Sequence, residues 1–227
     1  MHGSSLQYFP LAVPFILAFF LLVAVLLVLI EIGILRYAYE KIGIHRRYVL
    51  IVLGLSLFGS YVNIPIFELP AHSVISNKEV VFFGMRHIIP FVQEWPRTVI
   101  AINVGGAVVP IVISAYLVIK KRIYLRALAG VAIVAAFVHA LAQPVPGLGI
   151  AVPTLVPPIL AAVISLLISR RSAPPLAYVS GTMGTLIGAD LLNLGSIQGL
   201  GAPIVSIGGA GTFDGVFLTG IIAVLLS

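Results

Sequence analysis

The sequence has no cysteine and very little charge. Without cysteine the chain has no disulfide, no thiolate nucleophile and no cysteine-bound metal. Only 9% of its 227 residues are charged, whereas about a quarter are charged in soluble proteins. Hydrophobic residues make up 60%, and the mean hydropathy is +1.18. This composition excludes a soluble enzyme and predicts a multipass protein of the cell membrane, in which the lipid bilayer is the main partner.

No stretch is long and polar enough for a separate soluble domain. We therefore predict a single membrane domain over residues 1–227, with an all-α fold: a polytopic helical bundle. The net charge is +6, but the basic residues lie in short clusters between apolar runs, as the positive-inside rule describes. They indicate orientation, and we expect no nucleic-acid partner. Met1–Pro10 lacks the basic start of a signal peptide, so we expect it to lead into a retained first helix.

Apolar runs of membrane length predict about seven transmembrane helices. Their approximate bounds are Leu11–Tyr37, Tyr48–Asn63, Thr98–Ile119, Tyr124–Ala142, a run that ends at Ser169, Pro174–Leu194 and Pro203–Ser227. Between the second and third helices, residues 64–97 are predicted to form a short β-rich or interfacial external segment. The proline-rich stretch 143–158 predicts a turn or a partly re-entrant segment, and residues 195–206 predict a Gly-rich loop.

Most of the lysines and arginines follow the first, third and fifth of these helices. The loops after the second, fourth and sixth are neutral or balanced. This alternation predicts that the N-terminus lies outside and the C-terminus inside. The loop 195–206 is then external, and the positions nearest to it lie toward the outer face.

The last two predicted helices contain the only aspartates of the chain, Asp190 and Asp214. An acid inside an apolar segment costs free energy and usually has a function. Both aspartates fall within about two helical turns of the loop 195–206, so their depths match. Two carboxylates close together in a low-dielectric site share one proton. One acid and one base is the arrangement that activates water for peptide hydrolysis.

Stripes of small residues give a reason for the two aspartates to face each other. Ser180, Gly184 and Gly188 are spaced by four residues in the sixth helix, and the seventh carries Gly211, Gly215 and Thr219. If the two stripes pack together, as such stripes do in membranes, both carboxylates point to the same side of the helix pair. Asn193 and Thr182 fall on the Asp190 face and are predicted to orient its carboxylate. The alternative is that each aspartate separately caps a helix or lines a polar cavity.

Other polar residues have simpler interpretations beside functional ones. Asn103, followed by Gly105 and Gly106, is a candidate binding residue in the middle of the bundle, or a helix-packing site. His139 is a candidate proton relay, or a buried histidine with satisfied hydrogen bonds. The remaining histidines have no ligand spacing, so we predict no metal and no cofactor.

The segment Gly209-Ala-Gly-Thr-Phe-Asp214-Gly, together with Asp190, resembles the catalytic motifs of the presenilin and signal-peptide-peptidase class of intramembrane aspartyl proteases. That resemblance implies that Asp190 and Asp214 are a catalytic dyad and that Gly209 and Gly211 belong to the binding segment. In this sequence Thr212 and Phe213 separate Gly211 from Asp214. Over its whole length the chain resembles an uncharacterised prokaryotic multipass membrane family without an assigned activity, through Asn103-Val-Gly-Gly-Ala, Gly188-Ala-Asp-Leu-Leu-Asn and Gly208-Gly-Ala-Gly-Thr-Phe-Asp-Gly.

Two functions therefore stay open. The first is an aspartyl hydrolase that cleaves a transmembrane peptide with the Asp190 and Asp214 dyad. The alternative is a proton-coupled transporter of a small solute, since glycine and proline interrupt several predicted helices. An internal repeat of the helices would favour transport, and the sequence contains only a faint echo of one, between Val104-Gly-Gly-Ala and Ile207-Gly-Gly-Ala. A third possibility is an assembly partner whose aspartates bond to another subunit.

Overall fold

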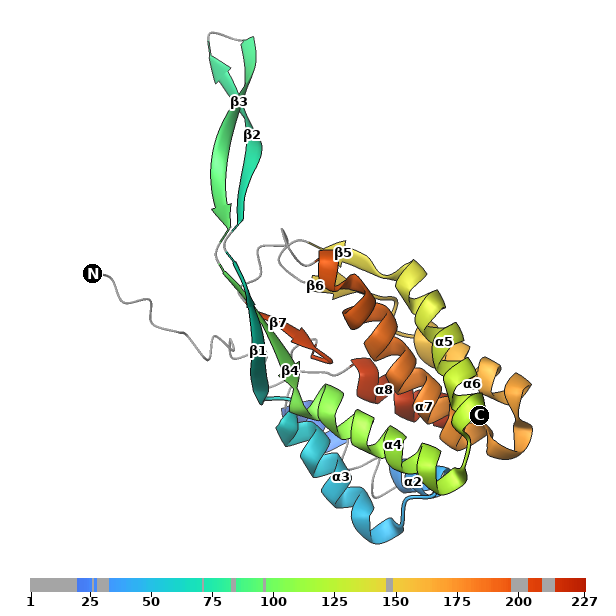
Figure 1. The fold of residues 1–227 in the computed structure, drawn as a ribbon. Coiled ribbons are helices and arrows are strands. Elements are labelled where there is room, and N and C mark those ends of the chain that lie inside the picture. The colour runs from blue at the N-terminus through green and yellow to red at the C-terminus, as the bar shows by residue number, and fades with distance from the viewer. Residues whose placement is uncertain are drawn as a thin grey trace.

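The chain forms a helical bundle with a small sheet and a long β-hairpin at one side, as the computed structural model in Figure 1 shows. The structure describes residues 20–25, 27, 33–70, 72–82, 85–95, 97–145, 149–196, 204–209 and 215–227. For residues 72–82 and 85–95, and for Leu35, Arg46, Gly149 and Phe217, it describes the backbone only. The first predicted helix lies mostly outside the described residues.

Two helices joined by a sharp turn form the first described part of the bundle. They are α2 (Ile34–Ile42) and α3 (Arg46–Gly59). Gly43, in the turn, has a φ of 98°, a left-handed conformation that favours glycine. The His45 ring accepts a hydrogen bond from the backbone N–H of Arg47 and so caps α3.

The strands lie beside the bundle. β1 (Asn63–Leu69), β4 (Thr98–Asn103) and β7 (Ile204–Ile207) form one sheet in the order β1-β4-β7, with β1 antiparallel and β7 parallel to β4. Between β1 and β4, the strands β2 (His72–Phe82) and β3 (Met85–Trp95) form a hairpin that projects from the bundle (Figure 1). The predicted β-rich segment is confirmed, but the all-α description is wrong for the three-stranded sheet.

The remaining chain is mainly helical. Its elements are the π-helical turn η1 (Val104–Val108), α4 (Val109–Lys121), α5 (Tyr124–Leu141), the short hairpin of β5 (Gln143–Val145) and β6 (Gly149–Ala151), α6 (Val156–Ile168), the 3₁₀ turn η2 (Arg170–Ser172), α7 (Ala173–Thr185), the π-helical turn η3 (Leu186–Asp190), the 3₁₀ segment η4 (Leu191–Ser196) and α8 (Gly215–Leu226). The turn predicted in the proline-rich stretch is thus the hairpin of β5 and β6. Prolines at the start of α4, α6 and α7 fit there because the first helical N–H groups need no partner within the helix.

Two segments predicted as helices begin as strands instead. The third begins with β4 and becomes helical only at Val104, and the seventh begins with β7, with α8 described from Gly215 onward. Short apolar runs rich in Val and Ile fit a buried strand as well as a helix, so apolar length alone does not distinguish them.

Within the described residues, two continuous helices are long and apolar enough to cross a membrane: Val104–Lys121 and Tyr124–Leu141. The bent pair of α2 and α3 would make a third if it counts as one span. The protein is therefore mostly helical with at least two membrane-length helices, and the predicted count of seven is not confirmed. α5 matches the predicted fourth helix, Tyr124–Ala142, almost residue for residue.

α7 lies at the centre of the bundle. Every residue of α7 except Pro174 and Met183 is buried. It packs against α4, α5, α6 and α8, which explains why small residues occur on several of its sides.

The stripe of Ser180, Gly184 and Gly188 was predicted to face the last helix, α8. In the structure it faces α5. A Cβ on Gly184 would lie 2.6 Å from Val134, and one on Gly188 would lie 2.5 Å from the carbonyl oxygen of Ala135. α8 instead contacts the neighbouring side of α7, where Thr219 packs on Gly181 and Gly220 on Thr182. The prediction was wrong because a small-residue stripe indicates a close approach but does not identify which neighbour approaches.

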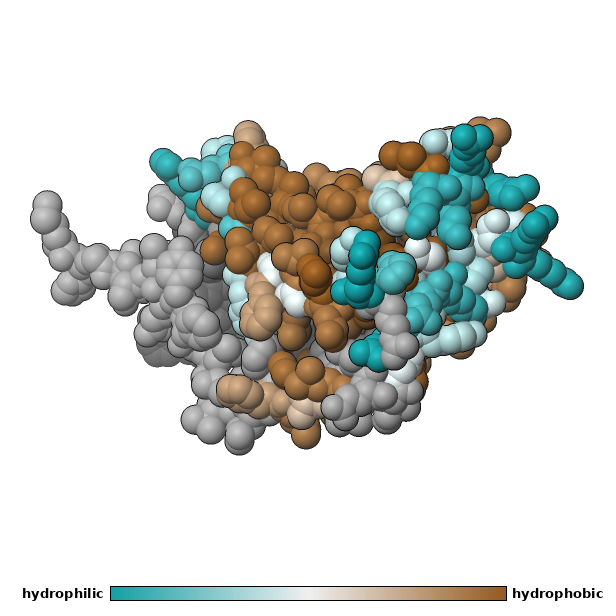
Figure 2. Space-filling model, turned by 90° about the horizontal axis from the view of Figure 1, so that it is seen from below, coloured by the Kyte–Doolittle hydropathy of each residue, from teal (hydrophilic) through white to brown (hydrophobic). Residues whose placement is uncertain are grey.

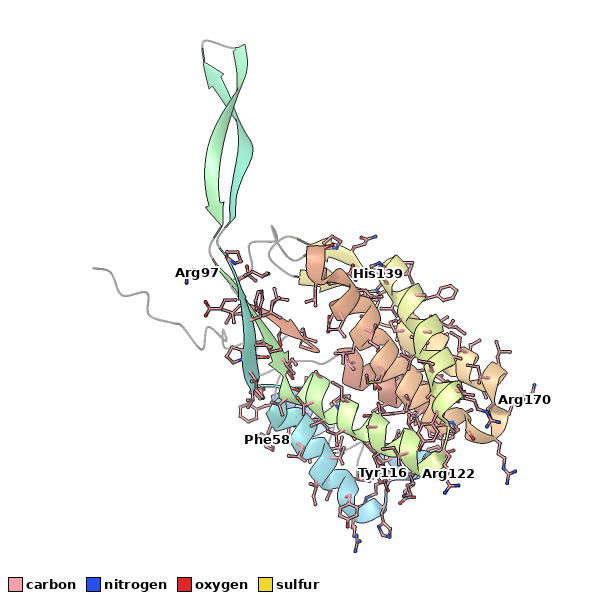
Figure 3. All side chains as sticks on the ribbon, viewed as in Figure 1. Phe58, Arg97, Tyr116, Arg122, His139 and Arg170 are labelled. Carbon is pink, nitrogen blue, oxygen red and sulfur yellow. The ribbon has the colours of Figure 1, made fainter. Side chains whose placement is uncertain are left out.

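The outer surface combines a wide apolar area with a charged end. Figure 2 shows a continuous hydrophobic area with hydrophilic residues gathered mainly to one side of it. Exposed large apolar residues lie on α3, α4 and α5, among them Leu55, Phe58, Val112, Leu125 and Leu128. In Figure 3, Tyr116, Arg122 and Arg170 lie toward one end of the bundle, and His139 and Arg97 toward the other. An apolar belt with cations at one end is the surface expected of a protein in a bilayer.

Candidate functional site

Two π-helical turns meet beside the three-stranded sheet. η1 begins directly after β4, and η3 ends at Asp190. Ala107 of η1 and Leu186 of η3 belong to one buried cluster, together with Ile100, Ile207 and Val216. π-Helical turns are rare and are frequently found at functional sites. Their meeting point is therefore our candidate site, which we call the junction.

Asp190 is bound to the backbone at the end of β7. The N–H of Gly208 donates a hydrogen bond of 2.6 Å to Oδ2 of Asp190. The Asp190 side chain is half-buried. The hydrogen bond joins the end of η3 to the Gly-rich segment that leads from β7 to α8, across eighteen positions of the chain.

Gly208 occupies a position that only glycine fits well. Its φ is 74°, and a Cβ there would lie 2.7 Å from Cβ of Ala107 and 2.7 Å from the carbonyl carbon of Gly106. The left-handed backbone turns the N–H of Gly208 toward Asp190, and the missing side chain lets β7 lie directly on η1. Both features are needed for the contact between the two segments.

Asn103 is the centre of the polar side of the junction. It is only 2% exposed. Its Oδ1 accepts from the N–H of Gly106 (2.8 Å), and its Nδ2 donates to the carbonyl oxygen of Ser60 (2.7 Å) and to Oδ1 of Asn63 (3.1 Å). The side chain thus caps η1 and ties it to the end of α3 and the start of β1.

Asn63 extends this network to β7. Its Oδ1 also accepts a hydrogen bond of 2.5 Å from Oγ of Ser206. Asn63 and Asn103 are paired residues of β1 and β4, and Ala101 of β4 is paired with Ser206 of β7. One polar network therefore connects all three strands of the sheet.

The glycine pairs that follow β4 and β7 lie against each other but differ in conformation. β4 and β7 are parallel neighbours with Ile102 paired to Ile207. Gly105 and Gly106 belong to the π-helical turn η1, whereas Gly208 has a left-handed φ of 74°. A Cβ on Gly209 would lie 3.2 Å from Cβ of Asn103. The similar sequences thus place glycines side by side after two paired strands.

Some of the predicted binding residues belong to the junction, and others do not contact the Asp190 carboxylate. Gly209 and Asn103 are part of the junction. Asn193 does not bond the Asp190 carboxylate: its amide donates to the carbonyl oxygens of Gly188 (2.8 Å) and Ala189 (3.0 Å). Asn193 thus bonds to the π-helical turn that carries Asp190 and stabilises it.

Thr182 is not near Asp190 either. Its Oγ1 donates to the carbonyl oxygen of Tyr178 (2.8 Å) and shares a hydrogen bond of 3.1 Å with Ser114 of α4. The predicted role in orienting Asp190 is wrong, because Thr182 precedes Asp190 by eight positions, about two turns of helix. Thr182 instead links α4 to α7. Gly211 and Asp214 lie outside the described residues.

Sequence reasoning missed Asn63, Ser206 and Gly208 as parts of the site. The available signal was the repeated Gly-Gly-Ala, which placed Gly208 in an equivalent position to Gly105. Nothing in the sequence indicated that Asn63, forty residues before Asn103, would bond to it. Among the described residues, no group of three His, Asp or Glu side chains gathers as a metal site would require. The absence of a metal and of a cofactor stays a prediction.

Comparison with known proteins identifies the family. Neither a curated protein nor a solved structure matches the chain, and the resemblance to intramembrane aspartyl proteases is not shown by these comparisons. The model of a family described as a protein of unknown function (DUF1614) matches residues 57–226, from the end of α3 to the end of α8. The chain belongs to the DUF1614 family.

Proposed function

We propose that the protein is an integral protein of the cell membrane whose working site is a pair of carboxylates, Asp190 and Asp214, and that the pair activates water to hydrolyse a peptide bond of a transmembrane substrate. The cationic end of the bundle is the cytoplasmic end in this proposal. The other predicted spans complete the seven-helix arrangement, with the N-terminus outside.

The proposal rests on the contacts of Gly208 and Val216, which lie on either side of Asp214 in the sequence. At its start, Gly208 is bonded to Asp190 (2.6 Å). At its end, Val216 packs in one cluster with Leu186, one turn before Asp190. Asp214 precedes Val216 by two residues, so the chain between these two anchors is held at both ends beside the turn that carries Asp190.

The depth of Asp190 in the bundle also fits a site near the outer face of the membrane. α7 begins directly after the cations Arg170 and Arg171, and Asp190 ends the helical run of α7 and η3. At about 1.5 Å per residue this run is roughly 25 Å long. Lys41 donates to the carbonyl oxygen of Val224 near the other end of α8, which places the end of α8 with the cations. Asp190 then lies toward the outer face, where a substrate segment would enter from the membrane.

A cysteine pair tests the geometry directly. Because the chain has no cysteine, the double variant Asp190→Cys/Asp214→Cys contains the only two thiols. Disulfides form between residues whose Cα atoms lie about 4.4–6.8 Å apart. We expect rapid oxidation in membranes, measured by a mobility shift of the protein after cleavage at an engineered protease site between the two positions. The matched control is Asp190→Cys/Thr219→Cys, because Thr219 packs on Gly181, more than two turns before Asp190.

Activity is tested with the protein in proteoliposomes and a library of labelled transmembrane peptides. We expect wild type to cleave a subset of peptides and Asp190→Asn and Asp214→Asn each to abolish cleavage while the protein stays folded. Asn keeps a side-chain oxygen that can cap a helix, so a capping role for Asp214 predicts retained cleavage in Asp214→Asn. Cleavage by either variant at the wild-type rate contradicts the dyad.

Transport is the second candidate, and the break from β4 through η1 to α4, beside the glycines that follow β7, favours it. Discontinuous segments that meet near a buried acid are typical of secondary transporters. In that case Asp190 and Asp214 line the pathway and carry the coupled proton. Uptake of solutes driven by a pH gradient in the same proteoliposomes, lost in both Asn variants and without peptide cleavage, would support transport. If the protein shows neither peptide cleavage nor solute uptake, a role in assembly is the remaining possibility.

A further inference from the structure

Two turns at the cationic end of the bundle lie against each other. One is the α2–α3 turn around Gly43, and the other is the end of α4. Nζ of Lys120 donates a hydrogen bond of 3.1 Å to the carbonyl oxygen of Gly43. Nζ of Lys121 lies 3.0 Å from the position that a Cβ on Gly43 would take. One ammonium group is therefore bonded to Gly43, and a second lies close to it.

Among the described residues no carboxylate forms an ion pair with either lysine, and this includes Glu40 of α2, the exposed acid closest to Gly43 along the chain. Lys41, Arg47 and Arg122 add further positive charge on the two turns. Among the described residues, the ion pair is that of Glu68 with Arg97 (3.9 Å), and it lies on the sheet side. Like charges held this close repel each other, and a bound anion would relieve the repulsion.

Tyrosine rings accompany the cations. Lys120 lies 4.9 Å from the ring centre of Tyr116 and donates to its hydroxyl (2.6 Å), Arg47 lies 4.6 Å from the ring of Tyr48, and Lys41 lies 5.5 Å from that of Tyr37. The rings and cations are within cation–π distance, and tyrosine is enriched at the interfaces between membrane and water. The site is thus at headgroup level.

The surface next to the two lysines is apolar. Ile119, directly before Lys120, is 64% exposed, and Tyr116, one turn earlier, is 46% exposed. In Figure 3, Tyr116 and Arg122 lie at this end of the bundle, and Figure 2 shows hydrophobic surface adjoining hydrophilic residues. A ligand here meets cations at one end and lipid-facing side chains at the other. This combination suits a phosphate group attached to acyl chains better than free phosphate.

We propose that Lys120 and Lys121, held against Gly43, bind the phosphate of an anionic phospholipid in the leaflet at the cationic end of the bundle. Tyr116 completes the site, with its ring beside the headgroup. The site is separate from the junction, so it stands whether the protein is a hydrolase or a transporter.

Lipid titration of the full chain tests the site. We would purify the protein in a neutral detergent and measure bound lipid by native mass spectrometry while adding phosphatidylglycerol or phosphatidylcholine. We expect selective retention of phosphatidylglycerol and a roughly 25-fold loss of affinity in Lys120→Gln/Lys121→Gln, since each cation near an anionic surface contributes about a factor of five. Lys120→Arg/Lys121→Arg keeps the charge and should restore binding to within about fivefold, which separates loss of charge from loss of folding.

The matched control is Arg170→Gln/Arg171→Gln, which removes two exposed cations from the same end of the molecule. We expect its affinity for phosphatidylglycerol to stay within about twofold of wild type, because exposed charges that do not contact the bound lipid are largely screened by salt. An equal loss in both double variants would show general attraction to charge and overturn the proposal. Displacement of the lipid by millimolar inorganic phosphate, or equal retention of phosphatidylcholine, would overturn it as well.

Discussion

Gly208 and Asn103 show how single residues hold the junction together. Gly208 supplies a left-handed backbone and an N–H for Asp190, and Asn103 uses both ends of its amide, as acceptor from Gly106 and as donor to Ser60 and Asn63. In an apolar surrounding each unsatisfied polar group costs free energy. These hydrogen bonds therefore both stabilise the protein and fix the position of Asp190.

We predict that Gly208→Ala destabilises the protein. A left-handed conformation costs a residue with Cβ about 1–2 kcal/mol, and the added methyl would collide with Gly106 and Ala107. The midpoint temperature of unfolding in detergent should fall by several degrees. Gly195→Ala is the matched control, since a Cβ there meets nothing within 4 Å. Equal midpoints for the two variants would contradict the account of Gly208.

Asn103→Ala removes three hydrogen bonds and takes a partner from the buried N–H of Gly106 and from the half-buried carbonyl oxygen of Ser60. We expect a loss of roughly 2–4 kcal/mol, since each unsatisfied buried group costs about 1–3 kcal/mol. Asn103→Ser keeps an oxygen that can cap η1 and should lose about half as much. Unfolding in mixed micelles with increasing denaturing detergent measures both. Identical losses would mean that the cap does not contribute.

At the scale of elements, α7 determines how the bundle packs. Glycines of α7 and of η3, which follows it, contact two neighbours: Gly184 of α7 and Gly188 of η3 lie against α5, while Gly181 of α7 lies against α8. Ser114 and Thr182 add a hydrogen bond between α4 and α7. Close backbone approach and interhelical hydrogen bonds are the main sources of helix association in membranes. α7 in turn places η3, and therefore Asp190, beside β7.

Filling the small-residue contacts should separate the helices. We predict that Gly188→Ala and Gly220→Ala each destabilise the protein by about 1–3 kcal/mol through overpacking. The methyl of Gly188→Ala would lie 2.5 Å from Ala135 of α5, and that of Gly220→Ala would lie 2.6 Å from Thr182 of α7. Gly54→Ala, on α3, meets nothing within 4 Å and should be neutral or stabilising by up to about 1 kcal/mol. Thermal unfolding of the three purified variants gives the comparison.

At the scale of the whole molecule, the cations gather at one end. Lys120 bonds to the α2–α3 turn, and Arg126 reaches Ser169 at the end of α6 (3.5 Å). Three basic turns that are far apart in the sequence are thus neighbours. The hairpin of β5 and β6 lies at the opposite end (Figure 1). This distribution agrees with the charge alternation in the sequence and supports the proposed orientation.

The orientation can be tested with single cysteines, because the chain contributes no background thiol. We predict that Arg171→Cys, at the cationic end, reacts with a membrane-impermeant maleimide only after the cells are opened. Thr154→Cys, in the exposed turn between β6 and α6, should react in intact cells. The reverse pattern of labelling would show that the cationic end faces outward.

The amino-acid sequence by itself determined the class of protein. Composition indicated a membrane protein, charge alternation predicted that the basic turns share one end, and apolar length located α5 almost residue for residue. Asp190 and Asn103 were also found from sequence as parts of the junction, because a polar residue in an apolar run is conspicuous, whereas Asp214 lies outside the described residues. Each of these inferences depends on local properties or on simple sums along the chain.

Only the tertiary structure decided which segments meet. The sequence did not show that β4 and β7 pair as parallel strands, that the small-residue stripe faces α5, or that Asn63 and Ser206 join Asn103 in one network. The physical reason is that apolar runs and small-residue spacings specify a kind of contact but not its partner. The partner is selected by the packing of all the elements together, and that selection brings Asp190 to Gly208.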